Sequence, residues 1–285
     1  MASLTLPHVA RSCCVCGSSA RDVLHEIRDP ERLTGSVNGQ VQPVTTAEQI
    51  VRCRTCGLQY VHPVIVWPIG SRAHTLNYDL DYFDHTRFSR QVGNTHLLRL
   101  VQRLLKKRGS WLDVGAGDGL LVSQAQASGW EALGIDIDAE LVAALGLERA
   151  SPPIQVIHLQ DADLDPGSFA VISLVNVLEH VEAPDEMVAA CTRLLRAGGL
   201  LVIHVPNVGS LGAMLRGASW RHYEPLSHLT FFDRHTLARL LERFGLEPLT
   251  LFSLPGSSRL KRSILALSDR LRIHLHDGLG LIARK

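Results

Sequence analysis

The second half of the chain alternates between short apolar runs and longer segments in which apolar residues recur every three or four positions. The runs have the length and composition of buried β-strands, and the segments between them have helical periodicity. The predicted strands cover residues 112–114, 132–135, 155–158, 169–174 and 200–206, and the predicted helices cover 97–107, 120–128, 139–145 and a segment that stops at the glycine pair 198–199. This alternation predicts an α/β fold with a doubly wound parallel sheet.

The pattern continues to the C-terminus. A helix with apolar positions from Leu237 to Phe244 is followed by a predicted strand over residues 246–254, and residues 277–285 form a predicted closing strand. Between them, residues 259–273 have leucines and isoleucines at helical spacing with basic residues around them. A surface helix explains this spacing, with contact to a membrane or an anionic substrate as the alternative.

A glycine-rich loop follows the first of the central strands, in the sequence Asp113-Val114-Gly115-Ala116-Gly117-Asp118-Gly119. Glycines at alternate positions let the backbone turn sharply and let a ligand approach it, and the next helix offers unpaired N–H groups at its start. A plain turn is the alternative interpretation. The register of strand, loop and helix favours a loop that holds a nucleotide-like ligand.

Two acidic residues narrow the choice of ligand. A dinucleotide-binding loop has the spacing G-x-G-x-x-G, whereas this loop has G-x-G-x-G and carries Asp113 just before it. An acid there would repel a pyrophosphate but suits a cationic amino group. Asp136 ends the second strand, where a carboxylate can bind both hydroxyls of a ribose. The two acids together predict a ligand with a ribose and an ammonium group.

This stretch resembles the class I S-adenosylmethionine-dependent methyltransferases, whose first motif is an acid followed by G-x-G-x-G and whose second strand ends in a ribose-binding acid. The resemblance implies a seven-stranded, mostly parallel Rossmann-like sheet with an antiparallel closing strand, and S-adenosylmethionine as cofactor. Asp113 and Gly115 would face the methionine end, Asp136 the ribose and Asp161 the adenine, although a solvated loop acid is the alternative for Asp161. The residues expected around the cofactor are Asp113, Gly115, Ala116, Gly117, Gly119, Asp136, Ile137, Asp161, Ala162 and Asn176.

Two further segments are candidates for the acceptor side. The sequence Leu-Glu-His-Val after the fourth strand resembles a signature of small-molecule methyltransferases, and it places Glu179 and His180 beyond the carboxyl end of a strand, where the cleft of such a sheet lies. An imidazole can deprotonate a hydroxyl near neutral pH, so we assign His180 and Glu179 to catalysis. A helix cap or a packing role is the alternative for His180.

Aromatic residues and histidines gather in residues 219–232 as nowhere else in the chain. This segment resembles the H-L-x-F-F stretch of the same enzymes, and in members that methylate sugar carbons the histidine of the matching stretch works as a base. His228 is the match, with capping of the helix near Asp233 as its alternative role. The predicted substrate contacts are Trp220, His222, Tyr223 and Tyr82, with core packing as the alternative for Trp220 and Tyr223.

Five of the six cysteines lie near the N-terminus. Two C-x-x-C knuckles, each followed by glycine, predict a four-thiolate zinc site with the ligands Cys13, Cys16, Cys53 and Cys56. Such a site is structural, because four thiolates leave no coordination position open for water or substrate. Disulfides are the alternative, although nothing in the sequence indicates secretion. The knuckles resemble the zinc-binding segment that precedes bacterial sugar-modifying and natural-product methyltransferase domains. We therefore expect a zinc-binding domain over residues 1–75, with a hairpin or loop at 29–46, and a methyltransferase domain over 76–285.

Composition limits the classes of partner. The chain has 29 Lys and Arg residues against 28 Asp and Glu residues, so no excess of basic residues indicates a nucleic-acid partner. No apolar run reaches the length that spans a bilayer, and the N-terminus lacks the features of a signal peptide, so we expect a cytoplasmic protein without membrane contact. The expected partner is a small molecule, and a homodimer is left open.

The sequence thus predicts methyl transfer from S-adenosylmethionine to an oxygen, nitrogen or carbon of a sugar, nucleotide-linked sugar or natural product. Two alternatives belong to other classes. A nicotinamide-dependent oxidoreductase would need the G-x-x-G spacing that the loop lacks. A non-catalytic binding protein with a zinc module and a relic of this fold would hold the donor weakly and transfer nothing.

Overall fold

A seven-stranded sheet forms the centre of the protein in the computed structural model, which describes residues 4–5, 7–26, 34–37, 40–45, 49–65, 72–73, 80–150, 153–224, 227–254 and 276–285. Its strand order is β12-β11-β10-β13-β14-β17-β16. The first five strands are parallel, and β17 lies antiparallel between β14 and β16, which confirms the predicted fold class and the direction of the closing strand. The strand bounds are β10 Ser110–Val114, β11 Glu131–Asp136, β12 Ile154–Val156, β13 Phe169–Val175, β14 Leu195–Pro206, β16 Glu247–Phe252 and β17 Gly278–Arg284.

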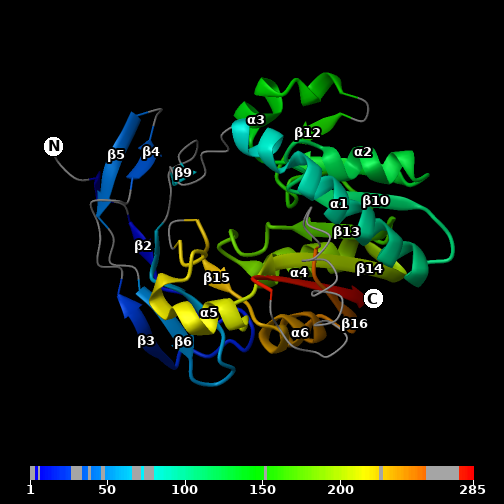
Figure 1. The fold of residues 1–285 in the computed structure, drawn as a ribbon. Helices are drawn as coiled ribbons and strands as arrows, with labels where there is room; N and C mark the ends of the chain where they lie inside the picture. Colours follow the sequence, from blue (N-terminus) through cyan, green and yellow to red (C-terminus); the bar gives the residue numbers. More distant parts are fainter. Residues whose placement is uncertain are drawn as a thin grey trace.

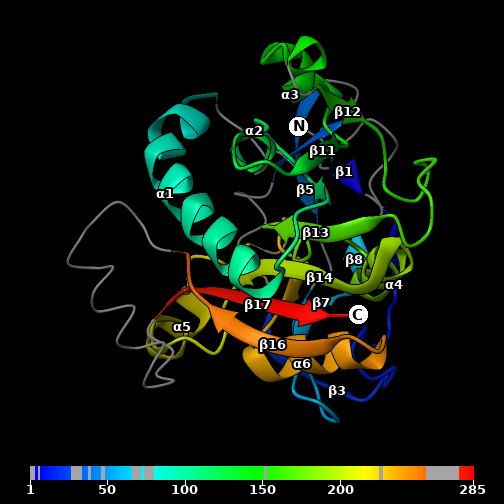
Figure 2. The same ribbon diagram turned by 90° about the vertical axis from the view of Figure 1, so that its right-hand side faces the viewer.

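Helices cover both faces of this sheet (Figure 1, Figure 2). Successive strand residues point to opposite faces, so Trp111 packs in the layer under α1 and α2, while its neighbour Leu112 packs in the layer under α4 and α6. The helices are α1 Leu80–Leu104, α2 Leu120–Ala127, α3 Ala139–Ala144, α4 Pro184–Leu194, α5 Leu211–Arg216 and α6 Arg234–Arg243, with short 3-10 helices at Leu147–Arg149 and Gly217–Ser219. β13 is buried along almost its whole length, as expected for a strand covered on both faces.

The order of the strands creates a topological switch point. The chain enters the sheet in the middle at β10, moves outward to β11 and β12, and then returns to β13 on the other side of β10. The connections after β10 and β13 therefore leave in opposite directions. Ligands of doubly wound sheets bind at such a switch point, beyond the carboxyl ends of the strands.

The predicted start of α1 and the predicted end of α4 differ most from the structure. Helix α1 begins at Leu80, well before the predicted start at residue 97, because its first half is largely polar and gives little apolar periodicity. Helix α4 ends at Leu194, so the glycine pair does not cap it; Gly198, with a φ of +73°, lies in the irregular start of β14 instead. The predicted helix over residues 259–273 lies outside the described residues.

The N-terminal segment builds smaller sheets. β3 Arg21–Glu26, β6 Gln49–Cys53 and β7 Gln59–His62 are antiparallel, and β15 Thr230–Phe231, from far along the chain, pairs with β7 to complete the order β15-β7-β6-β3. The pair β4 Thr34–Val37 and β5 Gln40–Thr45 forms the expected hairpin between the knuckles. Short strands complete the region: β1 Leu4–Thr5 pairs with β5, β9 Arg72–Ala73 with β4, and β2 His8–Val9 with β8 Val64–Ile65.

The N-terminal segment also shares a core with the central domain. Cys13, Val51 and Tyr60 belong to the same buried cluster as residues of α4 and α6. The domain boundary at residue 75 stays a prediction, but the contacts and the shared strand join the two parts closely (Figure 1). No helix within the described ranges combines the length and the apolar character needed to cross a bilayer.

Candidate functional site

The glycine loop lies between β10 and α2 at the carboxyl edge of the sheet. Gly115, Gly117 and Gly119 all have positive φ values, of +71°, +54° and +69°, a backbone region that favours glycine. A Cβ atom on Gly115 would also lie 2.4 Å from Cγ2 of Val177. Neither the conformation nor the space at residue 115 admits a side chain, so glycine is required there.

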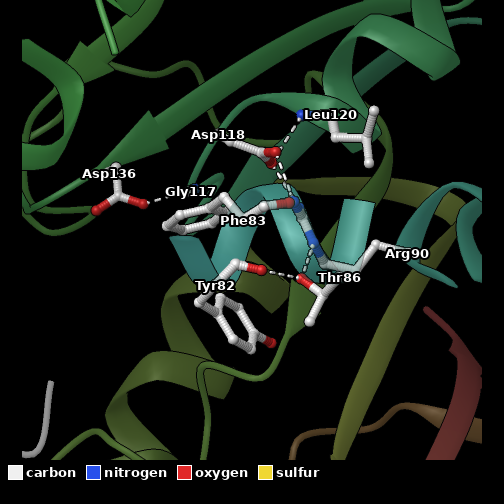
Figure 3. A network of polar contacts seen from close by, with 8 residues as sticks. All are labelled: Tyr82, Phe83, Thr86, Arg90, Gly117, Asp118, Leu120 and Asp136. Atoms are coloured by element: carbon white, nitrogen blue, oxygen red, sulfur yellow. Dashed lines mark hydrogen bonds and ion pairs between the residues drawn. The ribbon is translucent and has the colours of Figure 1, made fainter. Parts of the chain in front are cut away.

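Asp136 holds this loop in place. The N–H of Gly117 donates to Oδ2 of Asp136 at 2.8 Å (Figure 3). The N–H of Asp138 donates to Oδ1 of the same carboxylate at 2.9 Å. Asp136 ends β11, beside β10, and the next residue, Ile137, is 72% exposed. Asp161 is exposed in the turn that follows β12. The structure therefore brings the residues predicted for the ribose and the adenine to one edge of three adjacent strands.

Asp113 lies in β10 just before the loop and is buried. Oγ of Ser173 donates to its Oδ1 at 2.6 Å, and Nε1 of Trp111 donates to the same Oγ at 2.8 Å. Burial, together with the nearby carboxylates of Asp136 and Asp118, raises the pKa of Asp113 to about 7, although the Ser173 hydrogen bond opposes this shift. A cation bound beside Asp113 would return this pKa toward its ordinary value.

The start of α1 reaches over the loop, which the sequence did not predict. The guanidinium of Arg90 donates to both carboxylate oxygens of Asp118, at 2.6 and 2.7 Å, and lies 5.0 Å from the centre of the Phe83 ring (Figure 3). A Cβ on Gly117 would lie 3.4 Å from that ring. Tyr82 is 45% exposed and packs edge-on against Phe83. In the sequence, the acidic Asp118 among small loop residues is the feature that indicates a basic partner nearby.

The second predicted segment begins where β13 ends. Asn176 has a φ of +56°, and its Oδ1 accepts a hydrogen bond from Nδ1 of His204 on β14 at 2.9 Å. Its side chain is thus engaged toward β14, while its predicted contact with the cofactor stays untested. Burial lowers the pKa of His204 to about 4, with His276 and His222 adding to the effect. His204 is therefore neutral at physiological pH.

Glu179, His180 and His228 form a compact cluster. The two imidazole rings lie 4.8 Å apart, Nε2 of His180 is 3.8 Å from Oε1 of Glu179, and the donor atoms of the three side chains lie within 4.8 Å of one another. Glu179 is 1% exposed, and its Oε2 has no hydrogen-bond partner among the described residues. The cluster is close enough to share one proton or one cation.

Hydrogen bonds orient both imidazoles of this cluster. Nδ1–H of His180 donates to the carbonyl of Ser227, and Nδ1–H of His228 donates to that of His222, each at 2.8 Å. Burial lowers the pKa of His180 to about 4, lowers that of His228 as well, and raises that of Glu179 to about 8. Near neutral pH both rings are neutral, and Nε2 is the basic nitrogen that each presents.

The surrounding residues pack against this cluster and against the N-terminal strands. Asp233, not His228, caps α6, because its side chain accepts the N–H groups of residues 235 and 236. Trp220 is 2% exposed in a small core with Ile50, Val61, Ala213 and Phe231. The hydroxyl of Tyr223 donates to Oε1 of Gln59 at 2.5 Å. Trp220 packs edge to face against His222, and His222 stacks on His228. The Trp220 ring therefore contacts the His228 ring through His222.

The four predicted metal ligands converge. Sγ of Cys13 lies 3.4 Å from Sγ of Cys56, Sγ of Cys16 lies 3.6 Å from Sγ of Cys53, and all four sulfurs lie within 4.8 Å of one another without a disulfide. Gly17 and Gly57 close the two knuckle turns at positive φ, and each N–H donates to the carbonyl of the first cysteine of its knuckle. This arrangement fits a tetrahedral four-thiolate metal site.

The electrostatics of the knuckles agree with such a site. Burial of Cys53 would raise its pKa, but the N–H groups of Cys56 and Thr55 outweigh this effect and lower the pKa to about 7. Burial raises the pKa of Cys56 to about 11. The backbone thus already favours one thiolate, and a bound cation would ionise the others. Cys14 lies outside the set, and its carbonyl accepts a hydrogen bond from Arg243 at 2.7 Å.

Comparison with known proteins gives consistent results. A family model described as a methyltransferase domain matches residues 83–251. The chain is similar to ubiquinone biosynthesis O-methyltransferases from Methylococcus capsulatus, with 36% identity over 101 residues (34% of this chain, 43% of the relative), and from Thiobacillus denitrificans, with 30% identity over 147 residues (48% and 63%). The chain thus spans less than two thirds of the length of these relatives.

Solved structures share the fold at low sequence identity. A SAM-dependent methyltransferase from Archaeoglobus fulgidus superimposes with a TM-score of 0.54 at 20% identity, over 73% of this chain and 100% of that chain. A complex of the Haloferax volcanii Trm112 methyltransferase activator and a putative methyltransferase gives a TM-score of 0.52 at 14% identity, over 74% and 94%. The chain belongs to the methyltransferase-domain family and has the Rossmann-like fold of S-adenosylmethionine-dependent methyltransferases.

Proposed function

We propose that the protein transfers a methyl group from S-adenosylmethionine to a hydroxyl oxygen of a small molecule. The observation that carries the donor assignment is the contact between Gly117 N–H and Asp136 at 2.8 Å, which fixes the glycine loop and the ribose-binding acid as one unit. The buried Asp113 next to this unit suits a cationic amino acid group. A dinucleotide would instead bring a pyrophosphate to a loop that carries acids.

Most of the residues predicted to bind the donor have a specific role in this proposal. Asp136 takes the ribose hydroxyls, and Gly117 N–H keeps its carboxylate aimed along the edge of the sheet. Asp113 and Gly115 hold the methionine end, while Ile137, Asp161 and Ala162 enclose the adenine. The exposed faces of Ile137 and Asp161 leave this part of the edge open to a ligand. S-adenosylmethionine supplies an electrophilic methyl group, so the protein mainly has to align it with the acceptor.

The histidine cluster provides the acceptor side. Nε2 of His228 or of His180 accepts the proton of the acceptor hydroxyl; the oxygen forms a bond to the methyl carbon as the carbon–sulfur bond breaks, and S-adenosylhomocysteine leaves. Glu179, protonated near neutral pH, lies beside the His180 ring without adding a negative charge to the cluster. Oxygen is favoured over nitrogen or carbon because the curated relatives are named O-methyltransferases. A sugar, nucleotide-linked sugar or natural product is the acceptor class we propose.

The four cysteines support a structural zinc ion in the same protein. Their sulfurs converge at the spacing a single ion requires, and four thiolates fill a tetrahedral coordination shell. Zinc would supply cross-linking of the two knuckles and no reaction step. Cys13 and Cys53, both buried, would anchor it to the shared core.

Methyl-labelled donor incubated with a panel of nucleotide sugars and phenolic natural products tests this function. We expect Asp136→Ala to abolish donor binding in calorimetry, whereas His228→Ala should keep donor binding and lower turnover by about 10²–10⁴-fold. The exposed Asp163→Ala and His235→Ala variants are matched controls. Tight NAD binding without a response to S-adenosylmethionine would favour an oxidoreductase. Donor binding with no transfer to any acceptor would favour the non-catalytic binding protein.

A further inference from the structure

The segment that carries His228 is held from the N-terminal part of the chain. Strand β15 begins two residues after His228 and pairs with β7, and Val61 N–H donates to the carbonyl of Leu229 at 2.9 Å. On its other side, the N–H groups of Leu229 and Thr230 donate to the carbonyl of Glu179, at 2.7 and 3.2 Å. The backbone between the histidine and β15 therefore joins the cysteine-bearing sheet to the loop of Glu179.

Arg11 makes the same connection with a side chain. It stands two residues before Cys13, at the entrance to the first knuckle. Its Nε donates to the carbonyl of Val61 at 3.1 Å, Nη1 to that of Glu182 at 2.9 Å, and Nη2 to that of Leu229. A further contact from Nη2 reaches Oγ1 of Thr230 at 3.3 Å. One guanidinium thus bonds three segments, and its planar fork fixes their relative positions in a way that a flexible ammonium does not.

These anchors decide the geometry of the cluster. The carbonyls that orient His180 and His228 belong to Ser227 and His222, in the segment that β15 and Arg11 hold. Tyr223 of the same segment bonds Gln59 of β7. If the segment moved relative to the Glu179 loop, both imidazoles would lose their orientation together. A displacement of about 1 Å of a catalytic group is enough to lower a rate by about 100-fold.

We propose that Arg11 is a positioning residue, through which the cysteine module sets the spacing between the Glu179–His180 loop and the His228 segment. This rests on the proposed function, because only that function assigns the cluster to the acceptor. The module then acts as part of the framework of the acceptor site. A module that served only its own stability would leave the cluster unchanged when Arg11 is replaced.

Hydrogen exchange measured by mass spectrometry on the full chain tests the proposal without an acceptor. Arg11→Met should speed exchange by about tenfold or more in peptides over 179–183 and 227–231, because each carbonyl loses a charged donor. Exchange over the glycine loop, 113–119, and the donor dissociation constant should stay within about twofold of the wild type. Arg11→Lys should recover part of the protection. Arg54→Met, which removes an exposed pair with Asp22 in the same module, is the matched control.

Two further measurements separate positioning from general stability. In NMR of histidine-labelled protein, Arg11→Met should raise the pKa of His228 toward the ordinary value near 6.5, since a loosened segment lets water reach the ring. With an acceptor found in the panel, kcat should fall while the donor KM stays constant. Unchanged exchange at 227–231 in Arg11→Met, or a rise that extends over 113–119 in both Arg11 variants, would overturn the proposal. Failure of the wild type to methylate any acceptor would overturn the proposed function and leave the exchange test of Arg11 unaffected.

Discussion

The buried carboxyl of Asp113 should make donor binding depend on pH. Burial and the neighbouring carboxylates of Asp136 and Asp118 raise its pKa from 3.8 to about 7 in the ligand-free protein. The ammonium group of S-adenosylmethionine would favour the ionised form and bring the pKa down again. Binding should therefore release a proton from Asp113 wherever that residue is protonated beforehand.

The size of the effect follows from the two pKa values. If only the ionised form binds, about 3% of the protein is competent at pH 5.5 and about 75% at pH 7.5, so the dissociation constant should fall about 25-fold between them. The stability of the ligand-free protein changes in the opposite direction to donor affinity as the pH rises. Because the folded pKa lies above the unfolded one, Asp113 stabilises the ligand-free fold fully below about pH 4, and this contribution is lost as the pH rises through about 7. The donor should therefore raise the melting temperature most at the higher pH.

Isothermal titration calorimetry from pH 5.5 to 7.5, in buffers with different heats of ionisation, measures both the affinity and the proton released. The Asp113→Asn variant should bind the donor weakly, and its dissociation constant should not depend on pH in this range. Ser173→Ala removes the hydrogen bond that lowers the pKa of Asp113, so it should move the pH dependence upward. A dissociation constant that is flat over this range, or a slope that persists in Asp113→Asn, would refute the reasoning.

Three other predictions can be checked directly. Arg90→Met leaves Asp118 of the glycine loop without its ion-pair partner, so donor affinity should fall about tenfold or more and the melting temperature by several degrees. The loss should be smaller in Arg90→Lys, and an unchanged donor dissociation constant would contradict the role of this pair. The Cys53→Ser variant should contain no zinc in elemental analysis and should unfold at a lower temperature, whereas the Cys14→Ser variant should retain the metal. Full zinc content in Cys53→Ser would rule out the four-thiolate site. Turnover with saturating donor should rise as the imidazoles lose their protons and should already have reached its plateau at pH 6.5, because the pKa of His180 is near 4. A pH–rate profile measures this, and a single rise centred on pH 6.5 would contradict the assignment.

The fold and the donor loop could be predicted because their determinants are local in sequence. Strands buried on both faces are continuous apolar runs, and the glycines, Asp113 and Asp136 fall within one strand–loop–helix–strand unit. The contact of Arg90 with Asp118 joins residues 28 positions apart. Arg90 lies on α1, a helix whose beginning has no apolar pattern. No periodicity marks such a pair, so it became visible only in three dimensions.

The acceptor side was predicted in part. His180 and His228 were each proposed from a different motif, and the structure places their rings 4.8 Å apart. The direction of Asn176 toward His204 depends on a left-handed backbone conformation that the residue type permits but does not dictate. Strand β15 has two residues, too few for an alternating pattern, and so its pairing with the cysteine-bearing sheet could not be predicted.

The pairing of β15 with β7 has a consequence for how the chain folds during synthesis. The knuckles and β7 leave the ribosome early, but the partner that completes their sheet comes much later. Gln59 of β7 and Tyr223, in the segment that leads to β15, are 164 positions apart. Until then β7 is an edge strand with unpaired backbone groups, open to pairing with another chain. The N-terminal sheet can close only after most of the central domain exists, so this contact of long sequence separation forms late. An excised N-terminal fragment would keep its cysteines and expose that edge, which makes the fragment prone to aggregation.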